Sequence, residues 1–359
     1  MGKIQAMTGN TAAYTGAALC RPDLIAAYPI TPQSSVVEGL AGRVFTATSA
    51  QGLALMYEPY FRMSTLRIPM VMAIATREMT SPETIWSGQQ DAMSVRDAGW
   101  IQMFCESNQE ILDMMIQAYR ITENERVHIP VNVCYDGFYS SHLMEGLEVP
   151  TQEAVDTFLP AHNGCAYLDP GHPQALDPLT PGELMMHYRK SHLDAMQSAL
   201  DVIDEVDAEF YKSFGRSYGG CIEEYLCDDA DVVLITVGGM SGTGKDAVDA
   251  ARENGIRAGL IKLRFVRPFP AFRIANALKG KRAFAVVDRS VCFGWNAGPM
   301  YMETCAALAD ASDEYCHFSA IGGLGGADLS FEHMLSCIEK LEQAKSKPGA
   351  KETLWLMND

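Results

Sequence analysis

The sequence has no pair of cysteines with C-x-x-C spacing, although ten cysteines are spread over its 359 residues. A zinc or iron–sulfur site made from this chain alone needs clustered cysteine ligands, so we expect no metal site of its own. The cysteines are also too sparse for a disulfide framework. We therefore interpret most of them as buried thiols in a reducing compartment, and we expect a cytoplasmic location.

Long apolar runs and an excess of basic residues are missing as well. No run of roughly 18 apolar residues is present, and Met1–Gln5 lacks the apolar core of a signal peptide, so neither a membrane span nor a leader is expected. Lys and Arg number 28 against 45 Asp and Glu, which gives a net charge of −17. A field of this sign repels phosphate backbones and anionic lipids, which argues against nucleic acid and membranes as partners.

What is present is the composition of a folded protein. Hydrophobic residues make up 48% and charged residues 20% of the chain, and its length corresponds to about two domains. Apolar runs alternate with helical patterns in both halves, which predicts an α/β fold with parallel sheets. The expected organisation is an N-terminal domain over 1–150, a proline-rich crossing with a helical segment over 151–228, a C-terminal domain over 229–345, and a tail over 346–359 that docks on a partner.

Two glycine-rich segments need separate interpretation. Gly239–Asp246 fits G-x-x-x-x-G-K, but Asp246 stands where a nucleotide-binding loop has the serine or threonine that binds magnesium. We interpret the segment as a strand-to-helix turn before a helix near Lys245; a turn whose amides hold another phosphate group is the alternative. Gly322–Gly326 is interpreted first as a turn that lets another backbone approach and second as an anion site.

Two further segments carry side chains suited to an anionic ligand. Two prolines flank Thr31 and restrict the backbone around it. They hold its hydroxyl at the carboxyl end of a strand, where open α/β sheets bind ligands. Arg96 lies in a stretch of small and apolar residues, and its guanidinium offers a fork for a carboxylate. A salt bridge from Arg96 to Asp97 or Asp91 is an equally good explanation.

Taken in order, these motifs resemble the α subunit of pyruvate:ferredoxin oxidoreductase and its relatives, the 2-oxoacid:acceptor oxidoreductases. The matching segments are Tyr28–Pro32, Thr46–Leu53, Arg96–Gly99, Asp136–Phe138, Leu263–Pro270, Val287–Arg289 and Gly323–Gly326. The resemblance covers nearly the whole chain except about 151–225 and the tail, and it is specific as an ordered set. It implies two parallel-sheet domains of the transketolase type, the first binding the pyrimidine side of thiamine and the second transketolase-like.

The resemblance also implies a reaction and a set of partners. The family uses thiamine diphosphate, coenzyme A and 4Fe–4S clusters to convert a 2-oxo acid into an acyl-CoA and CO2, and electrons pass to ferredoxin or another acceptor. A β subunit supplies the diphosphate and Mg2+ side of the thiamine site, and cluster-bearing and γ-type subunits complete the complex. Carried over residue by residue, the cofactor-binding residues are Tyr28, Pro29, Ile30 and Thr31. Thr31 and Arg96 are the catalytic candidates, because both can donate hydrogen bonds to an anionic 2-oxo acid.

The sequence departs from the family at one place. Relatives have a further strand and helix between the segments that match Val36–Ala41 and Arg43–Ser49, and this insert carries a glutamate that protonates the aminopyrimidine. Here Ala41 and Gly42 join the two segments, and Glu38 does not match that glutamate. Either the chain lacks a βα unit or the sequence omits a segment of the natural protein. Because a sheet without an interior unit packs poorly, we expect an omission.

These observations rank three functions. The first is the α subunit of a 2-oxo acid oxidoreductase of anaerobic metabolism. The missing glutamate favours the second, a non-catalytic scaffold subunit of such a complex, and Asp246 argues against the third, a nucleotide-binding hydrolase. Pyruvate is the default substrate. The methionine-rich stretch from Met56 to Met103 would suit an adaptable apolar pocket, which leaves aryl or branched 2-oxo acids such as phenylglyoxylate open.

Overall fold

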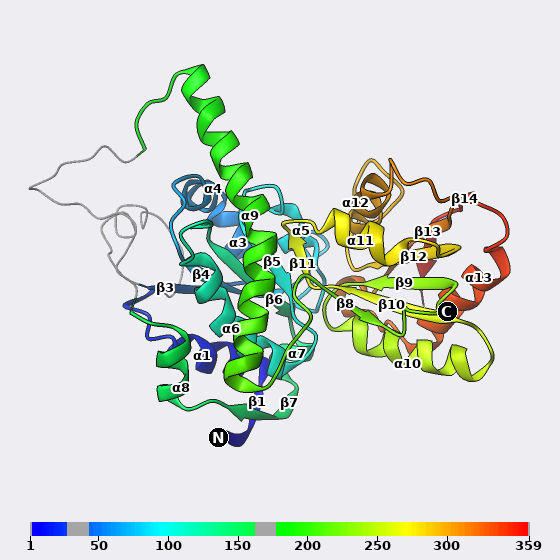
Figure 1. The fold of residues 1–359 in the computed structure, drawn as a ribbon, viewed down its shortest axis with the longest axis horizontal. Helices are drawn as coiled ribbons and strands as arrows, with labels where there is room; N and C mark the ends of the chain where they lie inside the picture. Colours follow the sequence, from blue (N-terminus) through cyan, green and yellow to red (C-terminus); the bar gives the residue numbers. More distant parts are fainter. Residues whose placement is uncertain (1, 27–42, 162–176, 358–359) are drawn as a thin grey trace, which may run out of the picture.

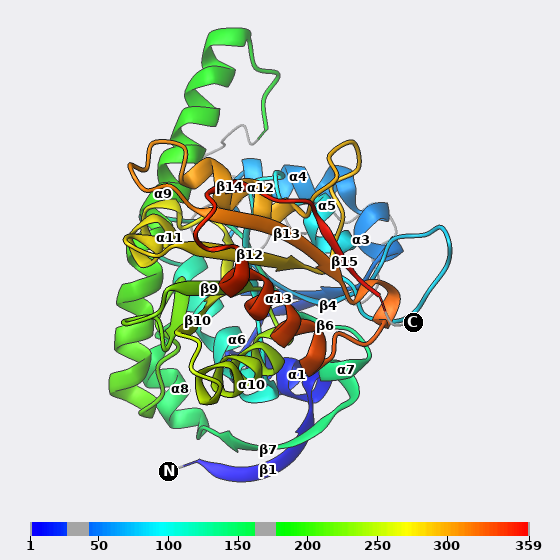
Figure 2. The same cartoon turned by 90° about the vertical axis from the view of Figure 1, so that its right-hand side faces the viewer.

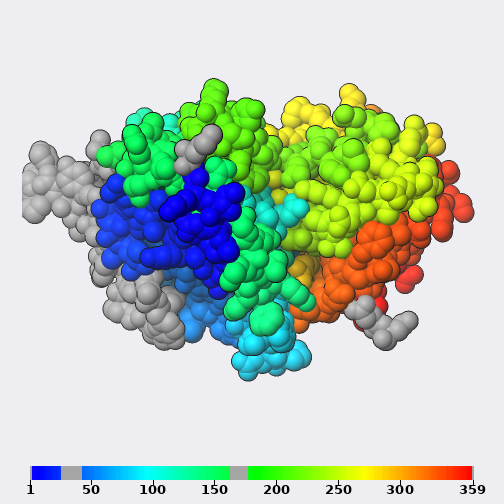
Figure 3. All heavy atoms as spheres, turned by 90° about the horizontal axis from the view of Figure 1, so that it is seen from below, coloured from blue at the N-terminus to red at the C-terminus, as the bar shows by residue number. Residues whose placement is uncertain are grey.

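The computed structural model describes residues 2–26, 43–161 and 177–357, which form two α/β domains side by side (Figure 1). The N-terminal domain is built on a six-stranded sheet and the C-terminal domain on a seven-stranded sheet. Figure 3 shows the two domains in contact along one broad boundary, with the blue to green part of the chain on one side and the yellow-green to red part on the other. Within the described ranges, no helix combines the length and apolar character that crossing a membrane requires.

The N-terminal sheet has the strand order β11-β5-β6-β4-β3-β2. Its parallel strands are β2 (Leu24–Ala26), β3 (Val44–Thr48), β4 (Val71–Thr76), β5 (Ile101–Phe104) and β6 (Val131–Asp136), and β11 (Phe265–Arg267) is antiparallel to β5. The helices of this half are α1 (Gly9–Leu19), α3 (Gln51–Leu55), α4 (Tyr57–Thr65), α5 (Gln90–Ser94), α6 (Asn108–Thr122), α7 (Tyr139–His142), α8 (Gln152–Phe158) and α9 (Gly182–Phe214). β1 (Lys3–Thr8) and β7 (Met144–Val149) form a separate antiparallel pair.

The C-terminal sheet has the strand order β14-β13-β12-β9-β10-β8, and β15 also pairs with β13. Its strands are β8 (Ile222–Tyr225), β9 (Val232–Thr236), β10 (Ala258–Leu263), β12 (Ala283–Asp288), β13 (Cys316–Gly322), β14 (Gly349–Ala350) and β15 (Leu354–Leu356). The helices are α10 (Met240–Glu253), α11 (Ala271–Leu278), α12 (Pro299–Ala307), α13 (Phe331–Ala344) and a short 3-10 turn at Leu324–Gly326. Among the described strands of this sheet, only β8 is antiparallel to its neighbour.

The central strands and the helices above them form for recognisable reasons. Every residue of β6, β9 and β12 is buried, as expected for strands that helices cover on both faces. α6 begins where the Ser107 hydroxyl accepts a hydrogen bond from the Glu110 amide at 3.3 Å, which satisfies one of the free amides of the first turn. α6 is then buried on nearly all sides, so it connects the sheet to the surrounding helices.

The chain crosses between the two domains within a single residue. β10 of the C-terminal sheet ends at Leu263, and β11 of the N-terminal sheet begins at Phe265. Arg264 lies between them and is fully buried. This crossing joins β10, the neighbour of the edge strand β8, to β11 at the edge of the N-terminal sheet. Figure 2 shows the sheets from the side on which the C-terminal domain faces the viewer.

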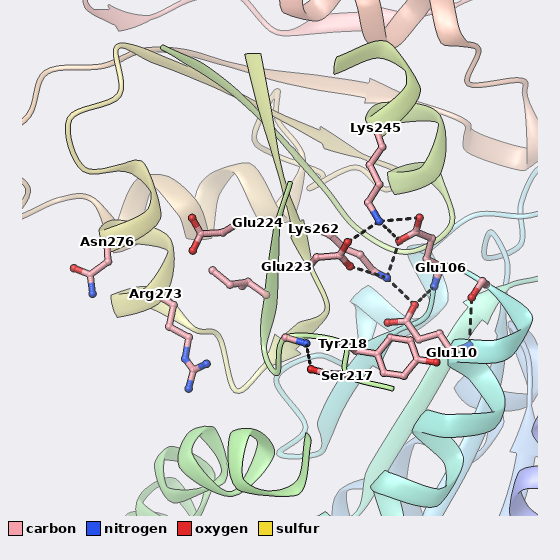
Figure 4. A pocket seen from close by; sticks show the side chains of 13 residues that line it. Glu106, Glu110, Ser217, Tyr218, Glu223, Glu224, Lys245, Lys262, Arg273 and Asn276 are labelled. Atoms are coloured by element: carbon pink, nitrogen blue, oxygen red, sulfur yellow. Dashed lines mark hydrogen bonds and ion pairs between the residues drawn. The ribbon is translucent and has the colours of Figure 1, made fainter. Parts of the chain in front are cut away.

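A buried network of charges lies beside this crossing (Figure 4). We call it the inter-domain charge cluster; its members are Glu106, Glu110, Glu223, Lys245, Lys262 and Arg264. The Lys262 ammonium lies 2.6 Å from Glu110 and 2.8 Å from Glu106. Because both glutamates belong to the N-terminal domain and all three cations to the C-terminal half, the ion pairs join the domains.

The cluster is balanced in charge and its inner members are inaccessible to water. Arg264 binds Glu110 through Nε and lies 3.1 Å from Glu223, while Lys245 lies 3.0 Å from Glu106 and 2.7 Å from Glu223. Burial by itself raises the pKa of the Glu110 carboxyl, but Lys262 and Arg264 outweigh it and lower the pKa to about 2. Glu110 is therefore a charged carboxylate that depends on both cations.

The predicted alternation of strands and helices is confirmed in both domains, with differences at three places. α10 begins at Met240 rather than near Lys245, because Gly244 lets the helix lie close on β10: a Cβ there would be 2.5 Å from a methyl of Leu260. β8 comes before the expected boundary at 229 but belongs to the C-terminal sheet, and β11 comes after it but belongs to the N-terminal sheet. The tail pairs with β13 through β14 and β15 and so extends this chain's own sheet; its docking on a partner stays a prediction.

Glu110→Gln is expected to lower the free energy of unfolding at neutral pH by about 3–5 kcal/mol, because Lys262 and Arg264 would stay buried without their carboxylate. The folded pKa of about 2 lies below the ordinary value of 4.5, so this stabilisation is present above pH 4.5 and is lost as the pH falls toward 2. Urea unfolding from pH 7 downward measures the difference between wild type and variant. Glu224→Gln is the control, because Glu224 is an exposed glutamate that lines the same pocket as the inter-domain charge cluster but is not a member of it. An equal loss of stability in both variants contradicts the prediction.

Candidate functional site

The parallel strands of the N-terminal sheet end together, and the loops after them form what we call the carboxyl edge. β3 ends at Thr48, β4 at Thr76 and β6 at Asp136. Ligands of open α/β sheets bind at this side. The predicted cofactor residues Tyr28, Pro29, Ile30 and Thr31 follow β2 and lie outside the described residues. The structure therefore shows the part of the candidate site that the loops after β3, β4 and β6 build.

The loop after β3 is a sharp strand–turn–helix elbow, Ser49–Gln51. Ala50 has φ 41° and ψ −113°, a combination that favours glycine and costs a residue with a side chain about 1–3 kcal/mol. Its side chain is fully buried. The Ser49 hydroxyl donates to the carbonyl of Ala75 at 2.7 Å, which ties the elbow to the end of β4. A strained backbone that the surrounding structure enforces is typical of ligand sites.

A buried carboxylate holds the elbow in place. Asp91 Oδ2 accepts hydrogen bonds from the amides of Ala50 at 2.8 Å and Arg77 at 3.0 Å, and Oδ1 accepts from the Ala92 amide at 2.8 Å. Burial raises the pKa of Asp91 to about 7, although these three amides oppose the rise. One side chain thus joins the ends of β3 and β4 to the beginning of α5.

The C-terminal domain reaches the same edge through Arg289. Its Nη1 lies 3.0 Å from Asp136 Oδ2 at the end of β6, and both side chains are buried. The Gly326 amide donates to the Ser87 carbonyl at 2.7 Å. Gly326 has φ +75°, and a Cβ there would lie 2.5 Å from the Cβ of Trp86. The first interpretation of the glycine cluster is confirmed, because it is a turn that lets the two backbones approach.

Glu78 is a second carboxylate of the carboxyl edge. Burial and the charge of Asp91 raise its pKa to about 7, while the Gly325 amide and Arg289 act in the opposite direction. Its Oε1 is buried without a hydrogen-bond partner. A carboxyl group with a pKa near neutral can hold or release a proton at working pH. The edge therefore combines ordered amides with two carboxyls that titrate near neutrality.

Arg96 lies two residues beyond α5 and is engaged in an ion pair. Its Nε is 3.2 Å from Glu303 of α12, and its Nη1 donates to the carbonyl of Met93 at 2.9 Å. Asp97 is 3.9 Å away, and Asp91 binds amides instead. The predicted salt bridge therefore exists, but its main partner is in the other domain. Arg96 also lines a cavity of about 450 Å³ that it shares with Arg189, Arg267, Phe61 and Met196.

The nucleotide-loop interpretation does not agree with the geometry. Residues Met240–Lys245 form the first turns of α10, whereas a phosphate loop wraps its amides around the ligand. Lys245 is bound to Glu106 and Glu223 and is not available for a triphosphate. In the described part of the chain, no group of three or more His, Cys, Asp or Glu side chains could hold a metal ion, and the cysteines there are free thiols, most of them buried.

Sequence reasoning did not find the residues that organise the carboxyl edge. Asp91 entered only as an alternative partner of Arg96, and Glu78 was not considered. Asp136 and Arg289 lay inside matching segments without an assigned role. Asp91 binds amides of residues 50 and 77, and no local spacing connects positions that far apart. Proximity to the ends of parallel strands is the signal that could have selected them.

Comparison with known proteins agrees with this arrangement. Residues 40–208 match the model described as "Pyruvate flavodoxin/ferredoxin oxidoreductase, thiamine diP-bdg", and residues 230–334 match "Pyruvate:ferredoxin oxidoreductase core domain II". The α subunit of NADH-dependent phenylglyoxylate dehydrogenase from Aromatoleum evansii is 43% identical, over 99% of this chain and 95% of its own length. The pyruvate synthase subunit PorA of Methanocaldococcus jannaschii is 38% identical, over 99% of this chain and 98% of its own length.

Solved structures show the same fold. A 2-oxoglutarate:ferredoxin oxidoreductase from Magnetococcus marinus, with 2-oxoglutarate, coenzyme A and succinyl-CoA bound, superposes with a TM-score of 0.69 at 17% identity over 94% of this chain and 65% of that chain. A split-gene transketolase, described as an inactive β4 tetramer, superposes with a TM-score of 0.53 at 10% identity over 94% and 99%. The predicted fold class, two parallel-sheet domains of the transketolase type, is confirmed.

The alignments also bear on the missing βα unit. They extend over 395 and 393 positions, more than the 359 residues of this chain, so these relatives have residues that this chain lacks. The first family match begins at residue 40, next to the join at Ala41. However, β2 pairs directly with β3 and is the outermost strand of its sheet. The described sheet is therefore continuous without the additional unit, and the omission of a segment from the sequence stays a prediction.

Asp246→Ser completes the nucleotide-loop pattern, yet we expect it to create no nucleotide binding, because the segment is helical and Lys245 is held by two carboxylates. Titration of ATP and magnesium into wild type and variant, followed by calorimetry, tests this. Asp246→Asn serves as the control for the loss of charge alone. Binding that appears only in Asp246→Ser would contradict the prediction.

Proposed function

The chain belongs to the pyruvate:ferredoxin oxidoreductase family, and we propose that it is the α subunit of a multi-subunit 2-oxo acid oxidoreductase. In this role it takes part in the oxidative decarboxylation of a 2-oxo acid with coenzyme A to an acyl-CoA and CO2. The observation that carries the proposal is the ordered match to α subunits over 99% of the chain. The carboxyl edge, with its strained elbow and buried carboxylates, supports a ligand site at the place that this fold uses.

Thiamine diphosphate and coenzyme A are the cofactor and co-substrate that the proposal requires. The match of residues 40–208 to a thiamine diphosphate-binding model supports the first. The carboxyl edge fits a polar group that can donate a hydrogen bond, because one oxygen of the Glu78 carboxyl is buried there without a partner. When bound, the cofactor supplies the electron sink for decarboxylation. Thr31 and Arg96 are the residues of this chain proposed to bind the cofactor and the substrate carboxylate.

Other subunits supply what this chain lacks. Because the similar relatives are named as subunits, we propose that a β subunit holds Mg2+ and the diphosphate and that 4Fe–4S clusters lie on further subunits, including a γ-type subunit. Large apolar side chains of the projecting first part of α9 are exposed, among them Leu184, Met186 and Tyr188 (Figure 1). Exposure of this kind is typical of surfaces that meet a partner. Ferredoxin or another acceptor then receives the electrons, and the cytoplasm is the proposed location.

The substrate is proposed as a class. One similar relative is named for phenylglyoxylate and another for pyruvate synthesis, and the two acids share the 2-oxo carboxylate but differ in the side chain. Arg96 addresses the shared carboxylate. Pyruvate is therefore the default and phenylglyoxylate the aryl alternative, and an assay with both acids distinguishes them.

A non-catalytic scaffold subunit is the second candidate. It is favoured by the residues that relatives have and this chain lacks, since the insert expected beside Ala41 would carry the glutamate that protonates the aminopyrimidine. Such a subunit would keep the fold and the interfaces but not the chemistry.

Only the assembled complex is expected to convert a 2-oxo acid, because half of the proposed site belongs to another subunit. The assay follows coenzyme A-dependent reduction of a viologen dye with pyruvate or phenylglyoxylate. The native complex and the purified chain are compared at equal concentrations. Turnover by the purified chain contradicts the proposal, and a complex that contains this chain but stays inactive with both acids favours the scaffold role.

Arg96→Lys in the native complex is expected to raise KM for the 2-oxo acid by roughly tenfold or more with a smaller change in kcat, because lysine keeps the charge but loses the two-pronged contact with a carboxylate. Steady-state kinetics measure both constants. Arg120→Lys, which alters a surface ion pair with Glu209, is the control for the substitution itself.

Glu303→Gln separates substrate binding from domain packing. It removes the ion-pair partner of Arg96 but leaves the arginine in place. If Arg96 binds the substrate, KM rises in Arg96→Lys and not in Glu303→Gln. An equal rise of KM in both variants shows that Arg96 acts through its ion pair with Glu303 and does not bind the substrate.

A further inference from the structure

We propose that Asp91 is a positioning residue of the carboxyl edge, because it holds the elbow Ser49–Gln51 and the beginning of α5 in one arrangement. This proposal rests on the proposed function, because it takes the carboxyl edge to be the cofactor side of the chain. Asp91 touches neither the substrate nor the reacting atoms in this view. It acts through the backbone of three segments that border the site.

The first argument is the geometry of the elbow. Ala50 has a backbone conformation, φ 41° and ψ −113°, that residues with a side chain rarely adopt. Its amide donates to Asp91 Oδ2 at 2.8 Å, and the amide of Arg77 donates to the same oxygen at 3.0 Å. One oxygen therefore binds the tip of the loop after β3 to the first residue after β4. Without this oxygen, both hydrogen bonds are lost, and the strained turn is no longer bound to the residue after β4.

The second argument is the nature of the group. Asp91 is fully buried, and in the described residues its carboxylate oxygens accept from backbone amides, with no ion pair to a lysine or arginine. A buried carboxylate is costly compared with an apolar side chain of similar size. An apolar residue would fill this position equally well for packing, but it could not gather three amides. The group is thus suited to fixing backbone positions rather than to filling space.

The third argument is the connection to Arg96. Asp91 lies in the first turn of α5, and the carbonyl of Met93 in the same helix accepts from Arg96 Nη1 at 2.9 Å. The Gln102 side chain donates to the carbonyl of Ala92 at 3.1 Å, which fixes α5 against β5. A shift of Asp91 would consequently move both the elbow and the arginine proposed to bind the substrate carboxylate.

Asp91→Asn tests the proposal in the native complex. The amide side chain has one acceptor oxygen where the carboxylate has two, so at least one of the three backbone amides loses its partner. We expect the dissociation constant for thiamine diphosphate and the KM for the 2-oxo acid each to rise roughly tenfold or more. Titration with thiamine diphosphate, monitored by tryptophan fluorescence, measures the dissociation constant. Steady-state kinetics measure KM.

Asp113→Asn is the matched control for lost stability. Asp113 is also a buried aspartate of the N-terminal domain, but it binds Arg216 at 2.7 Å and Tyr218 at 2.6 Å, away from the carboxyl edge. If Asp91 positions the site, Asp113→Asn lowers the melting temperature and leaves both constants near wild type. If the constants of the two variants follow their melting temperatures alike, Asp91 is merely structural and the proposal is overturned.

Hydrogen–deuterium exchange gives a readout that does not need activity. In Asp91→Ala, peptides that contain Ala50 and Arg77 should exchange roughly tenfold faster or more, because both amides lose the oxygen that they share, whereas Asp113→Ala should leave them unchanged. Unchanged exchange in Asp91→Ala overturns the proposal. If the wild-type complex fails to bind thiamine diphosphate, the proposed function fails, and the exchange experiment still decides whether Asp91 holds the elbow.

Ala50→Gly added to Asp91→Asn supplies a rescue test. Glycine adopts a φ of 41° without a side-chain penalty, so the elbow no longer depends on an external acceptor to the same degree. The double variant should recover part of the affinity for thiamine diphosphate. A double variant no better than Asp91→Asn contradicts the proposal.

Discussion

The inter-domain charge cluster is the constraint on which the arrangement of this chain depends. Lys262 and Arg264 bring positive charge from the C-terminal half to Glu110, a carboxylate on a helix of the N-terminal domain. Because the group is buried, removing one partner leaves an uncompensated charge, and the domains cannot separate without that cost. Arg264 is also the one residue between β10 and β11. The covalent crossing and the ion pairs therefore act at the same point, and they fix the angle at which the second domain meets the first.

That fixed contact explains why the carboxyl edge is built by both domains. With the sheets held together at β10 and β11, Arg289 reaches Asp136 at the end of β6, and the Gly326 backbone meets Ser87. The C-terminal domain thus covers one side of the edge and helps to exclude water from Glu78 and Asp91. Burial raises the pKa of both carboxyls to about 7, and the charge of Asp91 adds to the rise at Glu78. A carboxyl group whose pKa is about 7 differs from Glu110 of the charge cluster, because Lys262 and Arg264 keep the Glu110 carboxyl ionised.

The sequence predicted the elements that depend on interactions between residues close together in the chain. Strands such as β9 and β12 are apolar runs because both faces are covered, and their existence was predictable from pattern alone. The glycines of Gly239–Lys245 suggested a turn, yet packing on β10 made the segment helical, which is a tertiary effect. β11 is only three residues long and joins a sheet whose other strands lie far earlier in the chain, so no local pattern could place it. Asp91 was visible as a residue but not as an acceptor for amides at positions 50 and 77, because that role exists only after the sheet has aligned the ends of β3 and β4.

The position of β2 at the edge of its sheet means that the stability of the fold and the catalytic activity can be lost independently. Among the described strands of its sheet, β2 is the outermost and pairs with β3, and by resemblance the additional segment of relatives falls between these two strands in sequence. Since a further parallel strand cannot enter between neighbours that already pair, it would join at the outer edge of β2. Losing such a unit leaves the buried strands, the charge cluster and the elbow intact. It removes only what the edge strand carries, which by resemblance includes the glutamate of the thiamine site. A stable, correctly assembled chain is therefore compatible with either the catalytic or the scaffold role, and chemistry rather than stability distinguishes the two.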